Sequence, residues 1–291
     1  MSRKQDARAF PDLRRANVLF VGGIPRSGTT LMRVLLDTHP DIRCGEETHI
    51  LPTLLDFVDH FRKQKRMKLA GVTPEIFDMA TAAFISTVMQ LHGPPAEIIC
   101  NKDPFMLKHT RKLAQMFPEA KFILMLRDGR AAVHSMIVRK VAVANYDRRN
   151  PWQMLQMWNE NLKSMFSQCV ILGPNRCLPV YYEKLVLSTE QQMRRITNFL
   201  GIEWTGNFLE HEKHVGSDVK LSPAEYSTNQ VKQKVSEAAL DAWVGFFDDH
   251  INTNIDKIAP LLSELHYDTK SAHPKYDHLP ILWKGSNFTL K

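Results

Sequence analysis

Short unbroken apolar runs alternate along the chain with longer stretches in which apolar residues recur at helical spacing. The strongest runs lie at 18–21 and 121–126, and further runs lie at 97–100 and 177–182. Such runs are typical of strands that are buried on both faces of a parallel sheet. Because helical stretches separate them, the longest at 151–172, the pattern predicts one α/β domain with a central, mostly parallel sheet flanked by helices.

Helix-start residues and a polar stretch indicate where helices begin and end in the second half of the chain. Ser188, followed three residues later by Gln191, predicts a capping box at the start of a helix. The stretch at 211–231 is polar and irregular, and two more helices are expected after it, at 236–247 and 252–265.

Nothing in the sequence divides the chain into separate domains, because it contains no internal repeat and no linker rich in glycine, proline or serine. We expect one domain over residues 17–269, an N-terminal extension at 1–16 and an irregular C-terminal tail at 270–291. No apolar stretch approaches the length of a membrane span, and the N-terminal residues lack the apolar core of a signal peptide.

The first apolar run leads directly into a glycine-rich turn. Gly23 and Gly28 have G-x4-G spacing, and apolar positions recur at helical spacing from Leu31. A strand, loop and helix in this order are typical of a site where backbone N–H groups and the positive helix end hold a phosphate. Since Thr29 stands where nucleotide triphosphatases have a lysine for the γ-phosphate, a kinase is disfavoured. Further candidate anion ligands in the loop are Arg26, Ser27, Thr29 and Thr30.

Two other places combine charge with a loop. Glu46 and Glu47 are adjacent acids in a short loop, and they would repel an anion unless one of them has a chemical task. Arg127 follows the run at 121–126, at the end of a strand where open α/β sheets bind ligands. The alternative for Arg127 is a structural pair with Asp128.

Composition narrows the class of partner. The net charge of +7 favours an anionic partner, although a solvated basic surface has the same balance. Zinc-finger spacing and an RNP-type aromatic motif are both absent, so nucleic acid is not expected. The four cysteines lack C-x-x-C spacing and leave three disulfide pairings open, and counting alone slightly favours free thiols.

Taken in order, these motifs resemble those of the tyrosylprotein sulfotransferases. The P-x-S-G-T-T loop at 25–30 marks sulfotransferases broadly, whereas C-G-E-E-T at 44–48 and C-N-K-D-P-F at 100–105 narrow the resemblance to the tyrosyl-protein branch. The matching segments lie between Val18 and Asp268 and are 22–33, 39–48, 100–105, 127–130, 134–136, 182–183 and 227–231.

The resemblance implies 3′-phosphoadenosine 5′-phosphosulfate as the sulfuryl donor. The residues expected to bind it are Arg26, Ser27, Gly28, Thr29 and Thr30 for the 5′-phosphosulfate, Arg127, Ser135 and Arg139 for the 3′-phosphate, and Tyr182, Ser227, Thr228, Asn229, Gln230 and Val231 closing over the nucleotide.

The implied acceptor is a tyrosine hydroxyl in an acidic stretch of a secretory or membrane protein. Because a phenol has a pKa of about 10, a base must take its proton during transfer. The resemblance selects Glu47 as this base, and Arg26, Lys102 and Ser227 as groups that stabilise charge on the transferring oxygens. No metal is expected, since cations already line the loop and a sulfuryl group carries less charge than a γ-phosphate.

Further expectations come from the resemblance alone. It implies the disulfides Cys44–Cys100 and Cys169–Cys177, which reverses the preference for free thiols; by loop entropy they add roughly 4 and 2.5 kcal/mol. It also implies a homodimer in the Golgi lumen, and the Asn287-Phe288-Thr289 triplet fits an N-glycosylation acceptor. The family carries a transmembrane anchor, so we expect a trimmed, shortened or soluble form.

Three positions depart from the family pattern. His49 and Thr53 stand where the family usually has arginines for acidic substrates, and Ala242 stands where it usually has a lysine. These departures weaken the expected acidic-peptide preference and donor affinity, whereas the catalytic set is complete. A carbohydrate or small-molecule sulfotransferase and a donor-binding pseudoenzyme are the alternatives.

Overall fold

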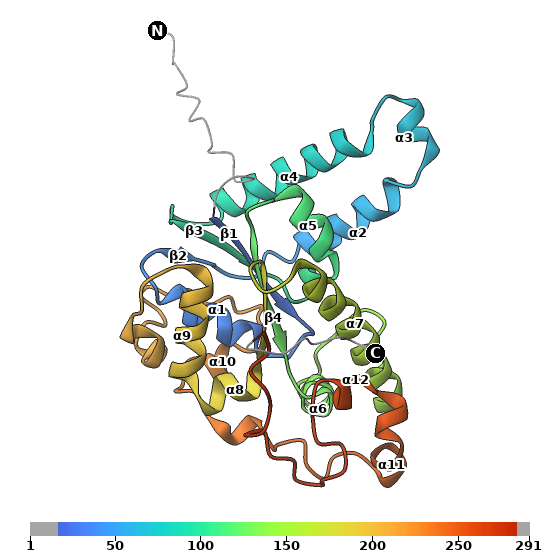
Figure 1. Cartoon of the computed structure of the whole chain (residues 1–291), viewed down its shortest axis with the longest axis vertical. Coiled ribbons are helices and arrows are strands. Elements are labelled where there is room, and N and C mark those ends of the chain that lie inside the picture. Colours follow the sequence, from blue (N-terminus) through green and yellow to red (C-terminus); the bar gives the residue numbers. More distant parts are fainter. Residues whose placement is uncertain (1–16, 284–291) are drawn as a thin grey trace.

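A parallel sheet of five strands forms the centre of the computed structural model, which describes residues 17–283 (Figure 1). The expected extension at 1–16 and the triplet at Asn287 lie outside the described residues. The strand order is β2-β3-β1-β4-β5, and every pairing is parallel. The strands are β1 (Asn17–Gly23), β2 (Ile42–Arg43), β3 (Ile98–Lys102), β4 (Lys121–Leu126) and β5 (Cys177–Tyr181).

The strand order places the end of β1 beside the end of β4, with Gly23 in register with Met125. From β1 the chain crosses to the edge strand β2, returns to β3 beside β1, and then continues on the other side of β1 to β4 and β5. Ligands of open parallel sheets bind at the carboxyl end of the sheet, where this order reverses. The glycine-rich loop and Arg127 therefore leave neighbouring strands at the same edge.

Helices cover both faces of the sheet, as the sequence predicted, and each face has its own apolar core. One face is covered by α1 (Thr29–Asp37), α8 (Tyr182–Leu187) and α9 (Thr189–Leu200), with α10 (Thr228–Val231) packed on α1. The opposite face is covered by α2 (Leu51–Phe61), α4 (Pro74–Leu91), α5 (Thr110–Met116), α6 (Gly129–Val138), α7 (Pro151–Leu172), α11 (Asp249–Ile258) and α12 (Leu261–Glu264). The short helix α3 (Lys65–Leu69) joins α2 to α4 at the end of an arm (Figure 1).

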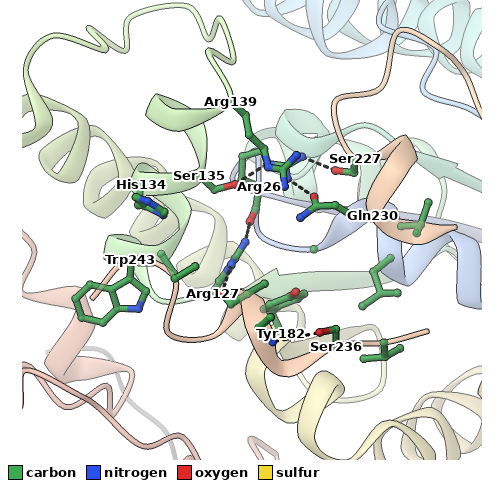
Figure 2. Close-up of a pocket in the computed structure, with 18 of the residues that line it drawn as sticks. Arg26, Arg127, His134, Ser135, Arg139, Tyr182, Ser227, Gln230, Ser236 and Trp243 are labelled. Carbon is green, nitrogen blue, oxygen red and sulfur yellow. Dashed lines mark hydrogen bonds between the residues drawn. The ribbon is translucent and has the colours of Figure 1, made fainter. Parts of the chain in front are cut away.

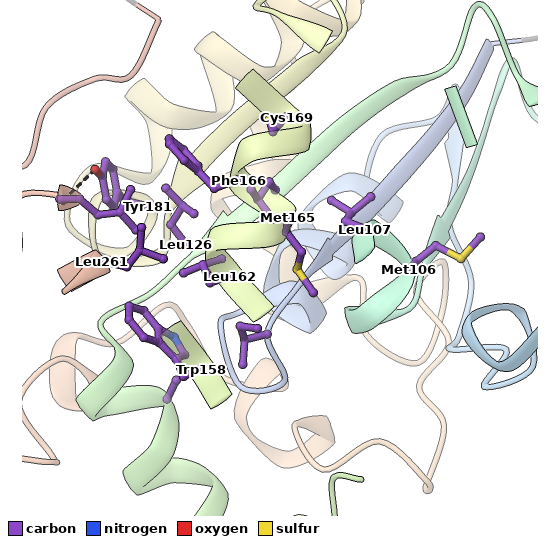
Figure 3. Close-up of a cluster of buried hydrophobic side chains, with 14 of the residues drawn as sticks. Met106, Leu107, Leu126, Trp158, Leu162, Met165, Phe166, Cys169, Tyr181 and Leu261 are labelled. Atoms are coloured by element: carbon purple, nitrogen blue, oxygen red, sulfur yellow. Dashed lines mark hydrogen bonds between the residues drawn. The ribbon is translucent and has the colours of Figure 1, made fainter. Parts of the chain in front are cut away.

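The long helix α7 is the main element of the larger core. Its Leu162 and Phe166 are buried in one cluster with Leu126 of β4 (Figure 3). The indole of Trp158 lies against the start of α6, where a Cβ on Gly129 would lie 2.6 Å from the ring. Glycine at this position thus allows α6 to begin close to α7, directly after Arg127 and Asp128.

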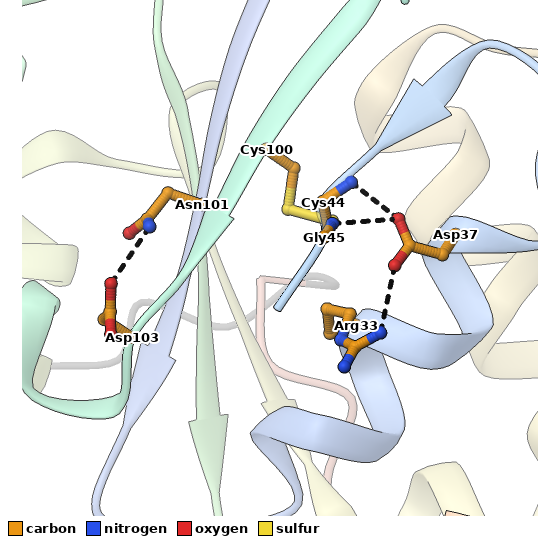
Figure 4. The surroundings of a disulfide bond; sticks show 7 residues. All are labelled: Arg33, Asp37, Cys44, Gly45, Cys100, Asn101 and Asp103. Atoms are coloured by element: carbon orange, nitrogen blue, oxygen red, sulfur yellow. Dashed lines mark hydrogen bonds and ion pairs between the residues drawn. A yellow bond between two sulfur atoms is a disulfide. The ribbon is translucent and has the colours of Figure 1, made fainter. Parts of the chain in front are cut away.

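Both expected disulfides are present, and all four cysteines are paired. The preference for free thiols that counting gave was therefore wrong, because spacing along the chain does not report which residues meet across the sheet. Cys44–Cys100 ties the loop after β2 to β3, and Asp37 Oδ1 accepts hydrogen bonds from the backbone of Cys44 at 2.6 Å and of Gly45 at 3.4 Å (Figure 4).

Three expectations for helices were wrong in detail. The side chain of Ser188 makes no capping hydrogen bond, because its backbone ends α8 and begins α9 without an intervening loop. The stretch at 236–247 contains only a 3₁₀ helix at Glu237–Ala239, and Gly245 has φ 76. The stretch at 252–265 breaks between α11 and α12, where Pro260 has no N–H to donate.

The described part of the C-terminal tail packs on the domain without forming a helix or strand. Tyr276, Leu279 and Leu282 are buried, and the indole N–H of Trp283 donates to the backbone of Cys177 at 2.7 Å. Across residues 17–283, the helices are all too short or too polar to traverse a lipid bilayer.

Candidate active site

The loop between β1 and α1 turns through left-handed backbone conformations. Arg26 has φ 72, which is unusual for a residue with a side chain, and Gly28 has φ 92. The ring of Tyr182 packs directly on Gly28, where a Cβ would lie 2.3 Å from a ring carbon. Glycine at position 28 therefore allows both the positive φ and the close approach of the Tyr182 ring to the start of α1.

The hydroxyls of this loop are buried, which is costly unless a partner satisfies them. Ser27, Thr29 and Thr30 are each less than a tenth exposed. Thr30 Oγ1 accepts a hydrogen bond from Lys102, whereas Ser27 Oγ has no partner among the described residues. The Ser27 hydroxyl lies inside the turn, 2.7 Å from the position of a Cβ on Gly23.

The Arg26 guanidinium lies where three segments meet (Figure 2). Its Nε donates to Ser135 Oγ at 3.0 Å, Nη1 donates to Ser227 Oγ, and Nη2 donates to Gln230 Oε1 at 2.6 Å. Burial and the nearby Arg127 and Arg139 lower the pKa of Arg26 to about 10, so it remains charged at neutral pH. Three arginines near one another form an excess of positive charge that favours a bound anion.

A cleft of about 490 Å³ opens beside these arginines. Arg127 donates to the Arg26 backbone at 2.7 Å and to the Ala239 backbone at 2.8 Å, and its guanidinium lies 4.4 Å from the centre of the Tyr182 ring. The alternative of an Arg127–Asp128 pair is excluded, because Asp128 instead binds Arg130, at 2.7 and 3.0 Å. The expected donor-binding residues that line this cleft are Arg26, Gly28, Arg127, Ser135, Arg139, Tyr182, Ser227, Gln230 and Val231.

Five expected donor-binding residues do not line this cleft: Ser27, Thr29, Thr30, Thr228 and Asn229. Thr228 Oγ1 donates instead to backbone oxygens of its own segment, at 2.8 Å. His134, from the matching segment 134–136, also lines it, and so does Trp243, which the sequence did not single out. The sequence signal for Trp243 was weak, because it lies in a stretch that was expected to be helical.

A second cleft, of about 410 Å³, lies on the other side of Arg26. Three residues line both clefts: Arg26, Gly28 and Ser227. Only the second cleft is lined by Thr29, Thr30 and Glu47. Of the three positions that depart from the family pattern, His49 and Thr53 also line the second cleft, whereas Ala242 lines the first. A group bound in one cleft can therefore reach a group bound in the other past Arg26.

Glu47 faces this junction. Its carboxylate contacts the Lys102 ammonium, and His49 Nδ1 lies 3.5 Å from Glu47 Oε2. Burial raises the pKa of Glu47, and the carboxylates of Glu225 and Asp103 act in the same direction, against the attraction of Lys102. Glu46 does not line either cleft, so the geometry distinguishes the two adjacent acids.

Glu225 is a buried acid that sequence reasoning missed. Its carboxylate accepts from the Glu47 backbone at 3.0 Å and lies 3.4 Å from the Lys102 ammonium. It also accepts two hydrogen bonds from Arg33, at 3.2 and 3.3 Å. No signal in the sequence separates Glu225 from Glu212 and Asp218 in the same polar stretch.

Glu47, His49 and Asp103 place possible metal ligands within 4.8 Å of one another. These atoms are already engaged: Glu47 contacts Lys102, and Asp103 accepts from Thr48 Oγ1 at 2.6 Å and from the His49 backbone at 3.0 Å. A cation here would compete with the Lys102 ammonium, so we assign these residues no role as metal ligands.

The chain is similar in sequence and in fold to known sulfotransferases. Residues 19–206 match the model of the "Sulfotransferase family". Protein-tyrosine sulfotransferase 2 of Gallus gallus is 48% identical over 281 residues, which cover 94% of this chain and 76% of that protein. Protein-tyrosine sulfotransferase A of Caenorhabditis elegans is 44% identical over 267 residues, covering 90% of this chain and 70% of that protein. The fold is similar to that of the sulfotransferase domain from the Synechococcus PCC 7002 olefin synthase, with a TM-score of 0.59. The two are 21% identical in sequence, and the match covers 87% of this chain and 97% of that domain.

Gly28→Ala is expected to weaken binding of adenosine 3′,5′-bisphosphate at least about tenfold, a change of about 1.4 kcal/mol. The added Cβ would displace Tyr182 from the cleft wall, because it would lie 2.3 Å from the ring. Isothermal titration calorimetry measures the affinity.

Gly201→Ala is the matched control, since Gly201 also has positive φ, at +79, but has nothing within 4 Å of an added Cβ. Both variants lose stability through backbone strain, and only Gly28→Ala is expected to lose affinity. Equal affinities of the two variants would contradict the assignment of the cleft.

Proposed function

Since the chain belongs to the protein-tyrosine sulfotransferase family, we propose that it transfers the sulfuryl group of 3′-phosphoadenosine 5′-phosphosulfate to tyrosine hydroxyls of proteins. The products are O-sulfotyrosine and adenosine 3′,5′-bisphosphate. One observation supports this most directly: two clefts meet at Arg26, and the second is lined by Glu47, whose carboxylate contacts Lys102 and whose charge acts on Arg26.

The first cleft is proposed to hold the donor. The 5′-phosphosulfate would lie on the loop at Arg26–Thr30, where the backbone N–H groups at the start of α1 supply hydrogen-bond donors. The 3′-phosphate would lie near Arg127, Ser135 and Arg139. The unpartnered Arg127 Nε supports this arrangement, because an anion would satisfy it.

The second cleft is proposed to hold the acceptor tyrosine. As its phenolic oxygen forms a bond to sulfur, the bond from sulfur to the 5′-phosphate oxygen breaks, and that oxygen keeps the electron pair. The phenolic proton passes to Glu47. By analogy with phosphoryl transfer, the transition state is loose and in line, so placement and charge stabilisation supply most of the catalysis.

Positive and hydrogen-bonding groups surround the proposed path of transfer. Arg26 and Ser227 line both clefts, and Lys102 lies behind Glu47 and Thr30. We propose that these three groups stabilise charge on the sulfuryl and bridging oxygens, and that no metal ion is needed. A base with a raised pKa suits this reaction, since a stronger carboxylate base accepts the phenolic proton more readily.

The charges of the second cleft bear on which tyrosines are accepted. Lys108 lines this cleft, but so do the carboxylates of Glu47, Asp56 and Asp103. We propose that acidic flanks are preferred only modestly, because His49 and Thr53 supply no permanent cation. The proposal of a Golgi lumen location gains support from the two disulfides, which persist in oxidising compartments; a homodimer is proposed from family resemblance alone.

Incubation of the protein with labelled donor should transfer sulfate to a tyrosine peptide and not to the same peptide with phenylalanine in place of tyrosine. The reason is that the phenylalanine ring offers no hydroxyl to attack sulfur. Mass spectrometry of the peptides measures the gain of one sulfuryl group. Transfer to glycan acceptors alone would support the carbohydrate sulfotransferase instead, and donor binding without any transfer would support a pseudoenzyme.

Glu47→Gln is expected to lower kcat by about 10²–10⁴-fold, the range for a lost general base. The wild-type rate should fall on acidification, because a base works only when ionised. Since the pKa of Glu47 is raised, this fall should begin above the ordinary range for a glutamate. Steady-state kinetics over a pH series measures both effects. Glu46→Gln is the control, and equal losses in the two variants would reject Glu47 as the base.

His49→Arg is expected to raise the preference for acidic over neutral flanking residues by up to about fivefold, which corresponds to an exposed ion pair of about 1 kcal/mol. Arginine carries a permanent charge, whereas histidine changes its charge near neutral pH. The ratio of kcat/KM for paired peptides measures the preference. His60→Arg, on α2 and outside both clefts, should leave the ratio unchanged; a similar rise there would indicate a general charge effect.

A further inference from the structure

Glu225 is a buried acid that lines the second cleft and pairs with two cations. Its side chain is 1% exposed. Arg33 from α1 donates to both of its oxygens, Lys102 at the end of β3 lies 3.4 Å from Oε2, and the Glu47 backbone donates to Oε1 at 3.0 Å. The carboxylate thus joins a helix, a strand and the loop that bears the proposed base.

Lys102 lies between two carboxylates whose surroundings differ. Burial raises the pKa of Glu47, and Lys102 offsets this only in part. Burial also disfavours the charge on Glu225, but attraction to Lys102 and Arg33 outweighs it and lowers the pKa of Glu225. Pairs of acids whose pKa values are pushed apart by their surroundings are characteristic of sites in which one acid moves a proton and the other keeps its charge.

We propose that Glu225 is a positioning residue for sulfuryl transfer: it remains ionised as the counter-charge of Lys102, and so leaves Glu47 free to accept and release a proton. This inference rests on the proposed function for its catalytic consequence. When Glu47 becomes protonated during transfer, Lys102 loses one anionic partner, and Glu225 supplies the remaining one. Lys102 can then keep both its charge and its place behind the transferring group.

The position of Glu225 along the chain adds a second consequence. It lies two residues before Ser227, which accepts a hydrogen bond from Arg26. The carbonyl oxygen of Glu225 also accepts a hydrogen bond from the Thr228 hydroxyl at the start of α10, and this bond connects the segment internally. The same segment therefore contacts Arg26 at the first cleft and the Glu47 loop at the second. Glu225 links the placement of the base to the segment expected to close over the donor.

Glu225→Gln tests this proposal, because glutamine keeps the shape and removes only the charge. We expect kcat to fall by about 10–100-fold, with a smaller change in KM for donor and peptide. The acid limb of kcat/KM should move to lower pH. Two charged groups explain this shift: repulsion from Glu225 disappears, and Lys102 then pairs with Glu47 alone. Arg33 faces Glu225 from α1 and has Asp37 as its other ion-pair partner.

Glu225→Asp restores the charge and is expected to return the acid limb toward the wild-type position, even where its shorter side chain costs rate. Glu210→Gln removes an exposed charge near the same polar stretch and should leave the profile unchanged. A lower kcat with an unchanged acid limb in Glu225→Gln would overturn the proposal and leave Glu225 with a purely structural role.

Thermal unfolding separates this inference from the proposed function, because it needs no turnover. A carboxyl with a lowered folded-state pKa stabilises the fold above its unfolded pKa, and this stability is lost as the pH falls through the folded value. Glu225→Gln should therefore lower Tm at pH 7 by roughly 5 °C or more, with a smaller difference in acid. Glu47→Gln should not lower Tm at pH 7, since its pKa is raised. Equal Tm losses in the two variants would overturn the inference, whereas failure to sulfate any tyrosine peptide would overturn only the function.

Discussion

The burial of the Lys102 ammonium is the constraint on which the rest of the site depends. Lys102 is 0% exposed at the end of β3, and a buried cation is tolerated only when oxygen atoms surround it. Oxygens of Thr30, Glu47 and Glu225 approach it from three separate segments. The segments that bear Glu47 and Glu225 are irregular. The charge of the Lys102 ammonium, more than backbone hydrogen bonding, therefore holds them together at one edge of the sheet.

Covalent and polar contacts hold the most exposed of these segments in place. The disulfide Cys44–Cys100 fixes the start of the Glu47 loop to the same strand that carries Lys102. Asp37 binds the backbone of this loop and also pairs with Arg33, at 3.3 Å, and Arg33 in turn binds Glu225. The loop that bears Glu47 is therefore held in place although it has no regular structure. A general base needs such fixed placement, because it must lie within hydrogen-bond distance of the hydroxyl that it deprotonates.

The sequence predicted the parts of the fold that depend on local pattern, and failed where long-range contacts decide. The buried runs and the helix at 151–172 were correct, because apolar periodicity follows directly from burial on a strand or helix. The stretch at 236–247 was expected to be helical, but it lines the first cleft, where the carbonyl oxygen of Ala239 accepts a hydrogen bond from Arg127. Glu225 could not be found, since its role comes from partners about 125 and 190 positions away.

Arg26 lines both clefts, and its charge links them. It has a left-handed backbone, a lowered pKa and three side-chain hydrogen bonds to Ser135, Ser227 and Gln230. Strain of this kind persists only where surrounding contacts compensate for it. An anion on the loop would compete for the same guanidinium N–H groups, and it would also relieve the repulsion between Arg26 and Arg127. The guanidinium that would attract the donor is thus already hydrogen-bonded within the protein, so donor affinity is the difference between these two sets of contacts.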